Sequence, residues 1–160
     1  MGVKKLSDIL RWCWELGIKI VTIYAFSTEN YARPEDEVDT LMTLFEKQFN
    51  AIVTDKDVHK HQVRVRAIGR LHQLPPRVQQ AIQKAEEATK DYNNYTLQIA
   101  ISYGGRAELI DAVKALVPRI CSGELTLDDL DEELFSRHLY TNGTPDPDLV
   151  IRTSGEVRIS

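Results

Sequence analysis

The sequence predicts an α/β fold, a mainly parallel β-sheet flanked by helices. Segments rich in β-branched and aromatic residues alternate along the chain with segments whose apolar residues recur at helical spacing. Strands separated by helices form βαβ units, in which the strands run parallel. The length of 160 residues suits one core. We therefore expect a single domain over residues 1–160.

The first half of the chain contains two predicted helices around one predicted strand. Apolar residues at helical spacing predict a helix over residues 3–13, and Gly17 is placed to end it. The sequence IKIVTIYAF at 18–26 is typical of a strand buried on both faces. Pro34 suits the first turn of the next helix, whose apolar stripe covers residues 38–52.

The second half continues the alternation. Its predicted strands lie at 63–68 and 96–103, and residues 148–153 are predicted to begin a fourth strand or to form a strand end. Helices are predicted from Pro75 and Pro76, from the turn Gly104–Gly105, and around residues 130–139. Together with the first half, this order favours a sheet built from successive crossovers.

Composition and charge exclude several classes of protein. Hydrophobic residues make up 42% and charged residues 28%, which is typical of a folded globular chain. The net charge of −4 argues against a nucleic-acid partner. No apolar run is long enough to span a bilayer, so any membrane contact would be peripheral. The two cysteines and four histidines show no metal-ligand spacing, and we predict no metal ligand among them.

Polar residues after the predicted strands indicate where a ligand would bind. In open parallel sheets, ligands bind outside the carboxyl ends of the strands. Polar residues occupy these places at 27–33, 103–106 and 152–160, and each group includes arginine. Arginine matches phosphate oxygens bidentately and stays charged. The sequence therefore predicts a site for a phosphorylated or otherwise anionic ligand, although it contains neither a P-loop nor a GxGxxG motif.

Taken one at a time, these residues also have simpler interpretations. Ser27, Thr28 and Asn30 are typical turn or cap residues. Arg152 and Arg158 suit ion pairs as well as they suit a ligand. The residue types alone leave both interpretations open.

Three motifs together resemble the cis-prenyltransferase family. FSTENYARP at 26–34 is similar to its F-S-x-E-N-x-x-R-P segment, and DLVIRTSGEVRIS at 148–160 to its D-L-x-I-R-T-S-G-E-x-R-x-S signature. ISYGGRAELIDAV at 101–113 resembles its N-Y-G-G-R segment. Their order and spacing agree over essentially the whole chain. Two positions depart from the pattern, since Tyr31 stands where tryptophan is common and Ser102 where asparagine is usual.

The resemblance implies a prenyltransferase related to undecaprenyl and dehydrodolichyl diphosphate synthases. Such an enzyme condenses isopentenyl diphosphate onto an allylic diphosphate, such as farnesyl diphosphate, with cis geometry, to make polyprenyl diphosphate. It uses Mg²⁺ and forms a homodimer or heterodimer. A cytoplasmic enzyme in contact with a membrane is implied, at the endoplasmic reticulum in a eukaryote, because the product has an apolar tail. The alternatives are a non-catalytic accessory subunit of such a complex and an unrelated phosphate-binding α/β module.

The resemblance also assigns roles to residues. Asn30 matches the asparagine implicated in removing a proton after condensation. An amide is a poor base, so we interpret Asn30 as orienting a proton acceptor, such as a phosphate oxygen or water. The isopentenyl diphosphate would be held by Arg152, Arg158 and Ser160. The full predicted substrate-binding set is Ser27, Thr28, Glu29, Tyr31, Arg33, Arg152, Arg158, Ile159 and Ser160.

Two parts of the family pattern have no counterpart in the 160 residues. These are its opening motif, M-D-G-N-G-R-W-A, and its ending, approximately N-F-L-L-W-Q-x-x-Y-x-E-L. Both supply carboxylates associated with Mg²⁺. The expectation is therefore an incomplete catalytic domain, truncated at both ends, that lacks the usual metal ligands.

Overall fold

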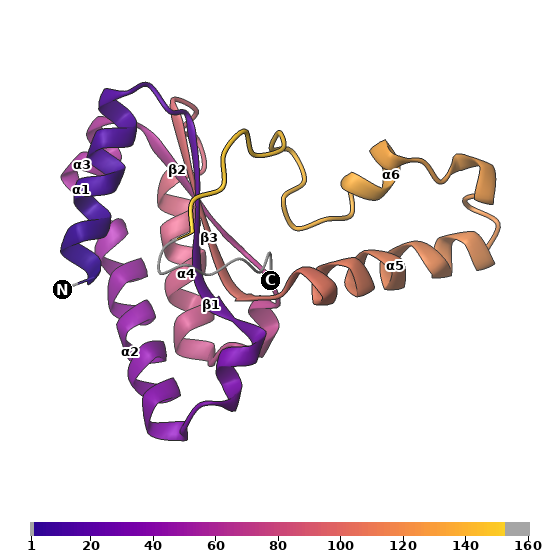
Figure 1. Ribbon diagram of the computed structural model, residues 1–160, viewed down its shortest axis with the longest axis horizontal. Coiled ribbons are helices and arrows are strands. Elements are labelled where there is room, and N and C mark those ends of the chain that lie inside the picture. The colour runs from indigo at the N-terminus through magenta and orange to yellow at the C-terminus, as the bar shows by residue number, and fades with distance from the viewer. Residues whose placement is uncertain (1, 153–160) are drawn as a thin grey trace. The chain divides into compact units, whose positions relative to one another are not determined.

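The computed structural model describes residues 2–152, with side chains from Asp8 onward (Figure 1). The chain forms two compact units, residues 1–103 and residues 104–160, and each is described by itself. The expectation of one domain over 1–160 stays a prediction.

The first unit is a three-stranded sheet with four α-helices. Its strands are β1 (Ile20–Ser27), β2 (Val63–Ile68) and β3 (Tyr95–Tyr103), in the order β1-β3-β2 and all parallel. Its helices are α1 (Gly2–Glu15), α2 (Glu35–Ile52), α3 (Lys56–Lys60) and α4 (Pro76–Thr89), with 3-10 turns η1 (Thr28–Ala32) and η2 (Leu71–Gln73). The predicted α/β class and parallel pairing are thus confirmed.

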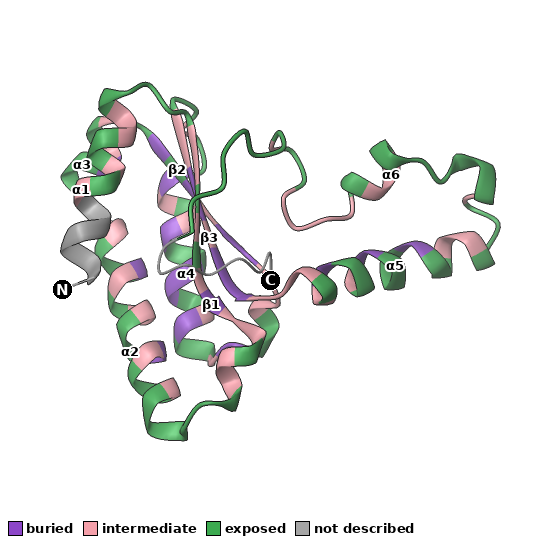
Figure 2. Cartoon of the chain, viewed as in Figure 1, coloured by how far each residue is buried: buried purple, intermediate pink, exposed green. Residues whose placement is uncertain are grey.

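The core of this unit lies between the sheet and its helices. Helices α1, α2 and α4 lie on one side of the sheet in Figure 1. Buried residues gather on the strands and on the sides of α2 and α4 that face them (Figure 2). In α2 the predicted stripe is confirmed: Met42 and Phe49 are buried, and the rest of the stripe packs against the core. Removing this apolar surface from water is the main source of stability of the unit.

Strand β2 lies at an edge of the sheet, and two of its backbone N–H groups donate hydrogen bonds to side chains of α4. The backbone N–H of Val65 donates to Oγ1 of Thr89 (3.1 Å), and that of Ala67 donates to Oε1 of Glu86 (2.8 Å). Thr89 is fully buried and its hydroxyl donates in turn to the carbonyl of Ala85 (2.9 Å). Helix side chains therefore satisfy amides that would otherwise be open to pairing with another chain.

Substituting Thr89→Val is expected to lower the free energy of unfolding by about 1–3 kcal/mol, because the buried N–H of Val65 loses its acceptor. Urea denaturation measures the change. Thr40→Val is the matched control, since the Thr40 hydroxyl makes the same bond to a carbonyl four residues earlier (2.8 Å) on the exposed side of α2. Its cost should stay within about 0.5 kcal/mol. Equal losses in the two variants would show that the Val65 amide does not depend on Thr89.

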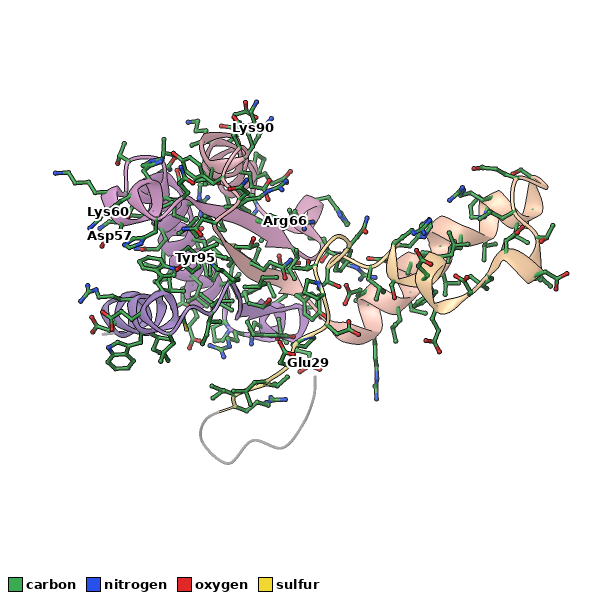
Figure 3. All side chains as sticks on the ribbon, turned by 90° about the horizontal axis from the view of Figure 1, so that it is seen from above. Glu29, Asp57, Lys60, Arg66, Lys90 and Tyr95 are labelled. Carbon is green, nitrogen blue, oxygen red and sulfur yellow. The ribbon has the colours of Figure 1, made fainter. Side chains whose placement is uncertain are left out.

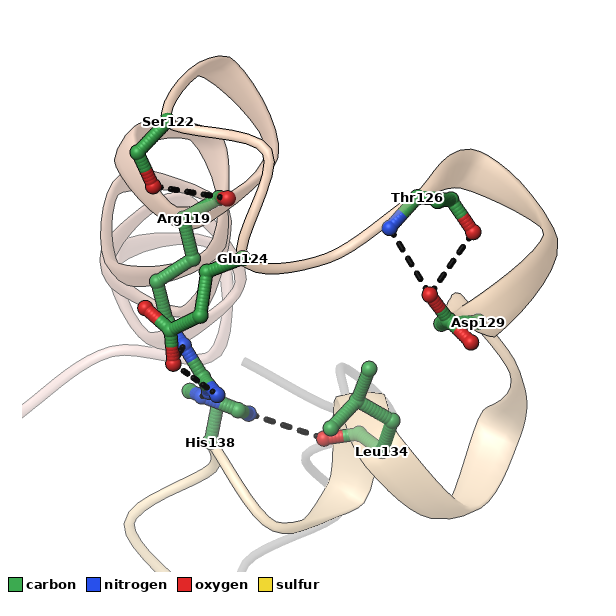
Figure 4. Close-up of polar contacts among 7 residues, drawn as sticks. All are labelled: Arg119, Ser122, Glu124, Thr126, Asp129, Leu134 and His138. Atoms are coloured by element: carbon green, nitrogen blue, oxygen red, sulfur yellow. Dashed lines mark hydrogen bonds and ion pairs between the residues drawn. The ribbon is translucent and has the colours of Figure 1, made fainter.

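The second unit contains α5 (Gly105–Cys121), η3 (Leu127–Asp129) and α6 (Glu132–Ser136). Arg119 pairs with Glu124 (2.7 Å) and contacts Nε2 of His138 (3.3 Å), whose Nδ1 donates to the carbonyl of Leu134 (2.8 Å; Figure 4). These contacts connect the end of α5 to α6. The hydrogen bond from Arg119 lowers the pKa of the Glu124 carboxyl.

A second set of contacts connects the start of α5 to the segment after α6. Glu108 is 6% exposed and its Oε1 accepts from the backbone N–H of Tyr140 (2.7 Å). The Tyr140 hydroxyl donates to the carboxylate of Asp111. Both acidic residues of α5 are therefore used within this unit.

The predicted strand at 148–153 is wrong over its described part. Residues 148–152 are irregular, and Thr153 lies outside the described residues. The β-branched composition suited a strand, but a strand forms only where a neighbouring strand accepts and donates hydrogen bonds. Within the part of the chain that the structure describes, no strand pairs with this segment, and Leu149, Val150 and Ile151 are 75%, 68% and 79% exposed.

Candidate functional site at the carboxyl edge of the sheet

The segment after β1 forms a closed turn. Strand β1 ends at Ser27, η1 follows, and Pro34 leads into α2. The side-chain oxygen of Asn30 accepts from the backbone N–H of Ser27 (2.8 Å), and the carbonyl of Asn30 accepts from the N–H of Arg33 (3.2 Å). Asn30 thus has a structural role, which agrees with its simpler interpretation as a turn or cap residue. The side-chain contact uses the carbonyl oxygen, and the amide NH₂ group is the part of Asn30 suited to donating to a ligand.

Tyr31 connects this turn to the end of β3. Its ring packs edge to face on Phe26, with ring centroids 4.9 Å apart. Its hydroxyl donates to Oγ of Ser102 (3.3 Å), and the Ser102 hydroxyl donates to Oε1 of Gln73 (3.3 Å). Residues from the carboxyl ends of three different strands, two after their strand and one near the end of β3, therefore meet at one edge, as the topology of a parallel sheet requires.

The exposed side chains of the turn are charged. Glu29 and Arg33 are exposed, whereas Ser27, Thr28 and Asn30 are half-buried. In Figure 3, Glu29 lies at a margin of the first unit away from α3 and the end of α4, where Lys60 and Lys90 are labelled. Arg33 is the basic residue of the turn at 27–34. Its guanidinium can bind two oxygens of one anion.

The remaining predicted residues are not part of this arrangement. Arg152 is described and exposed, in the irregular segment of the second unit. Arg158, Ile159 and Ser160 lie outside the described residues. Their roles at the site stay predictions.

Comparison with known proteins identifies the family. The Prenyltransf family model, which describes undecaprenyl diphosphate synthases, matches residues 1–160. The chain belongs to this family, the cis-prenyltransferases.

Individual relatives agree with this assignment. The chain is 57% identical over 99% of its length to the tritrans,polycis-undecaprenyl-diphosphate synthase (geranylgeranyl-diphosphate specific) of Pyrococcus horikoshii. It is 54% identical over its whole length to the enzyme of the same name from Methanocaldococcus jannaschii. The crystal structure of lavandulyl diphosphate synthase from Lavandula x intermedia, in complex with dimethylallyl diphosphate, is similar with a TM-score of 0.90 and 36% identity. That match covers 99% of this chain and 68% of that one. The chain spans about 60% of the length of the Pyrococcus relative.

Cis-prenyltransferases typically depend on Mg²⁺, and we tested whether the described residues fit such an ion. Among residues 8–152, whose side chains the structure describes, no three histidine, cysteine, aspartate or glutamate side chains come together as a possible metal site. The described side chains thus form no ready-made cluster of three such ligands, and no chemical step is assigned to a metal.

The strand-end segments singled out in the sequence did not include one that lies at the same edge of the sheet. Gln73 and the segment 69–73 follow β2 and lie at the same edge as η1, through the contact of Gln73 with Ser102. The signal was present, since Gly69 directly follows a predicted strand and the strand-end rule applies to it equally.

Proposed function

We propose that this protein is a cis-prenyltransferase enzyme that condenses isopentenyl diphosphate onto an allylic diphosphate to make a polyprenyl diphosphate. The observation that carries the proposal is the 57% identity to the Pyrococcus synthase over 99% of the chain. The names of that relative and of the Methanocaldococcus relative specify geranylgeranyl diphosphate. Geranylgeranyl diphosphate is therefore the primer we propose, whereas the sequence predicted an allylic diphosphate and gave farnesyl diphosphate only as an example.

The geometry of η1 supports a role for this turn in the reaction. A carbon–carbon bond forms between the allylic carbon and the isopentenyl unit, the bond from the allylic carbon to its diphosphate group breaks so that diphosphate leaves, and the isopentenyl unit loses a proton. Arg33 would bind diphosphate oxygens by charge-assisted hydrogen bonds, and Arg152 would hold the isopentenyl diphosphate. Asn30, fixed by its contact with the Ser27 amide, would orient the group that accepts the proton.

Other family properties enter as proposals of the same kind. We propose an assembly of two chains, a requirement for Mg²⁺, and a cytoplasmic location in contact with a membrane. Among the helices described, none is long and apolar enough to cross a membrane. Mixing two variants that are inactivated at different residues would test the assembly. Activity that returns in the mixture would show that the two chains contribute residues to a shared site.

The Asn30→Asp variant tests the catalytic proposal separately from stability. Aspartate keeps an oxygen for the Ser27 amide, so η1 should stay closed, but it lacks the NH₂ donor. We expect incorporation of labelled isopentenyl diphosphate to fall at least about 100-fold, with little change in the melting temperature. Asn50→Asp, on an exposed position of α2, is the matched control and should keep full activity. If Asn30→Asp were as active as the control, Asn30 would have only the structural role.

A further inference from the structure

A single buried hydroxyl joins two loops of the first unit. Tyr31 belongs to η1, Gln73 ends η2, and Ser102 lies near the end of β3, the strand between β1 and β2. The hydrogen bonds run in one direction, from the Tyr31 hydroxyl to Ser102 and from the Ser102 hydroxyl to Gln73. Each hydroxyl that accepts and donates in this way strengthens its neighbour's bond. Loops far apart in sequence are thereby linked through one atom, Oγ of Ser102.

The backbone holds Ser102 in an unusual conformation. Its φ of 52° lies in the left-handed region, and its side chain is fully buried. Its carbonyl accepts from the backbone N–H of Arg70 (3.0 Å). Gly69 approaches so closely that a Cβ there would lie 2.3 Å from the carbonyl oxygen of Ile101 and 3.1 Å from that of Ser102. A non-glycine residue persists in this conformation only where its surroundings determine it, and such residues cluster at functional sites.

We propose that Ser102 is a positioning residue that holds η1, and with it Asn30, in place relative to the segment 69–73. The inference rests on the proposed function and adds Ser102 and Gln73 to the site. The two positions at which the motifs depart from the family pattern, Tyr31 and Ser102, contact one another, and they act as a pair.

The lengths of the two bonds set the size of the expected effect. Both are 3.3 Å, longer than the usual 2.7–2.8 Å between the two oxygens of an O–H···O hydrogen bond. Hydrogen bonds at catalytic sites are often long before a substrate binds, and they tighten in the complex. Loss of the chain should therefore alter the mobility of the loops and the turnover more than the global stability.

Amide hydrogen exchange tests the linkage directly, without any substrate. Tyr31→Phe removes one hydroxyl and keeps the ring against Phe26. We expect exchange to become about fivefold faster in η1 and also in η2, to which Tyr31 is linked through the Ser102 hydroxyl. Tyr92→Phe is the matched control, because its hydroxyl contacts His59 (2.8 Å) instead, and it should leave both turns unchanged. Faster exchange in η1 alone, or in neither turn, would overturn the proposal.

Kinetics of Ser102 variants then test the consequence for the reaction. Ser102→Ala should lower kcat about tenfold with little change in KM, because the substrates still bind but Asn30 is less well placed. Ser102→Asn should restore most of kcat, since asparagine tolerates a positive φ and offers both a donor and an acceptor. A wild-type protein without turnover would contradict the proposed function, whereas the exchange result would still decide the linkage. An active Ser102→Ala variant with unchanged kcat would contradict the positioning role.

Discussion

Gly69→Ala is expected to cost at least about 3 kcal/mol of unfolding free energy, the largest single effect that we predict. The φ of Gly69 is 124°, a conformation that side-chain-bearing residues rarely adopt. A Cβ there would lie 2.3 Å from the carbonyl oxygen of Ile101. That atom belongs to the backbone of β3, so relief would require the strand to move rather than a side chain to turn. The substitution should therefore disturb the carboxyl edge of the sheet, and with it the site.

The Gly17→Ala variant separates the destabilisation caused by the steric clash from that caused by the positive φ. Gly17 also has a positive φ, 75°, but apart from Gly17 and its two chain neighbours no described residue has a heavy atom within 4 Å of the position of an added Cβ. Its substitution should cost only about 1–2 kcal/mol, the usual penalty of the left-handed region. Urea denaturation of both variants gives the difference. A Gly69→Ala variant no less stable than Gly17→Ala would mean that the approach of Gly69 to β3 does not constrain the fold.

Arg33→Ala is expected to weaken binding of geranylgeranyl diphosphate about 10- to 100-fold. A hydrogen bond to a charged group contributes about 1.5–3 kcal/mol, and about 1.4 kcal/mol corresponds to a tenfold change in affinity. Arg33 is exposed, and only its backbone N–H is used to close η1. The fold should therefore be unaffected by loss of its guanidinium.

Isothermal titration calorimetry measures this effect, with Arg64→Ala as the matched control. Arg64 is also exposed, but it lies near the beginning of β2, whereas η1 follows the carboxyl end of β1. Binding to the control should equal that of the wild type. Equal affinities of Arg33→Ala and Arg64→Ala would remove Arg33 from the site.

Periodicity in the sequence predicted most of the fold, because those elements depend on local patterns. The structure contains the predicted strands at 63–68 and 96–103 and the helix with its stripe at 38–52. The spacing of apolar residues predicts these elements because it marks the face of each that is buried. Helix α3 was missed because it has only five residues and is stabilised by the cap of Asp55, whose carboxylate accepts from the N–H groups of Asp57 and Val58. The predicted strand at 148–153 failed because strand formation depends on a partner that local composition does not reveal.

The site was predictable to the extent that it follows from topology. The rule for parallel sheets found the segment 27–33 and the end of β3. It did not reveal that Ser102 has a positive φ, or that its hydroxyl meets Tyr31 and Gln73. Those facts belong to long-range contacts, like the close approach of Gly69 to β3, between segments about 30 or more residues apart.

Incorporation of labelled isopentenyl diphosphate into butanol-extractable product is the most direct test of the proposed function. The assay combines purified, folded protein with geranylgeranyl diphosphate and Mg²⁺. The proposal predicts labelled polyprenyl product that requires the allylic diphosphate and is lost in Arg152→Ala. No product from protein that melts cooperatively would contradict an independent enzyme and favour the alternative of a non-catalytic accessory subunit.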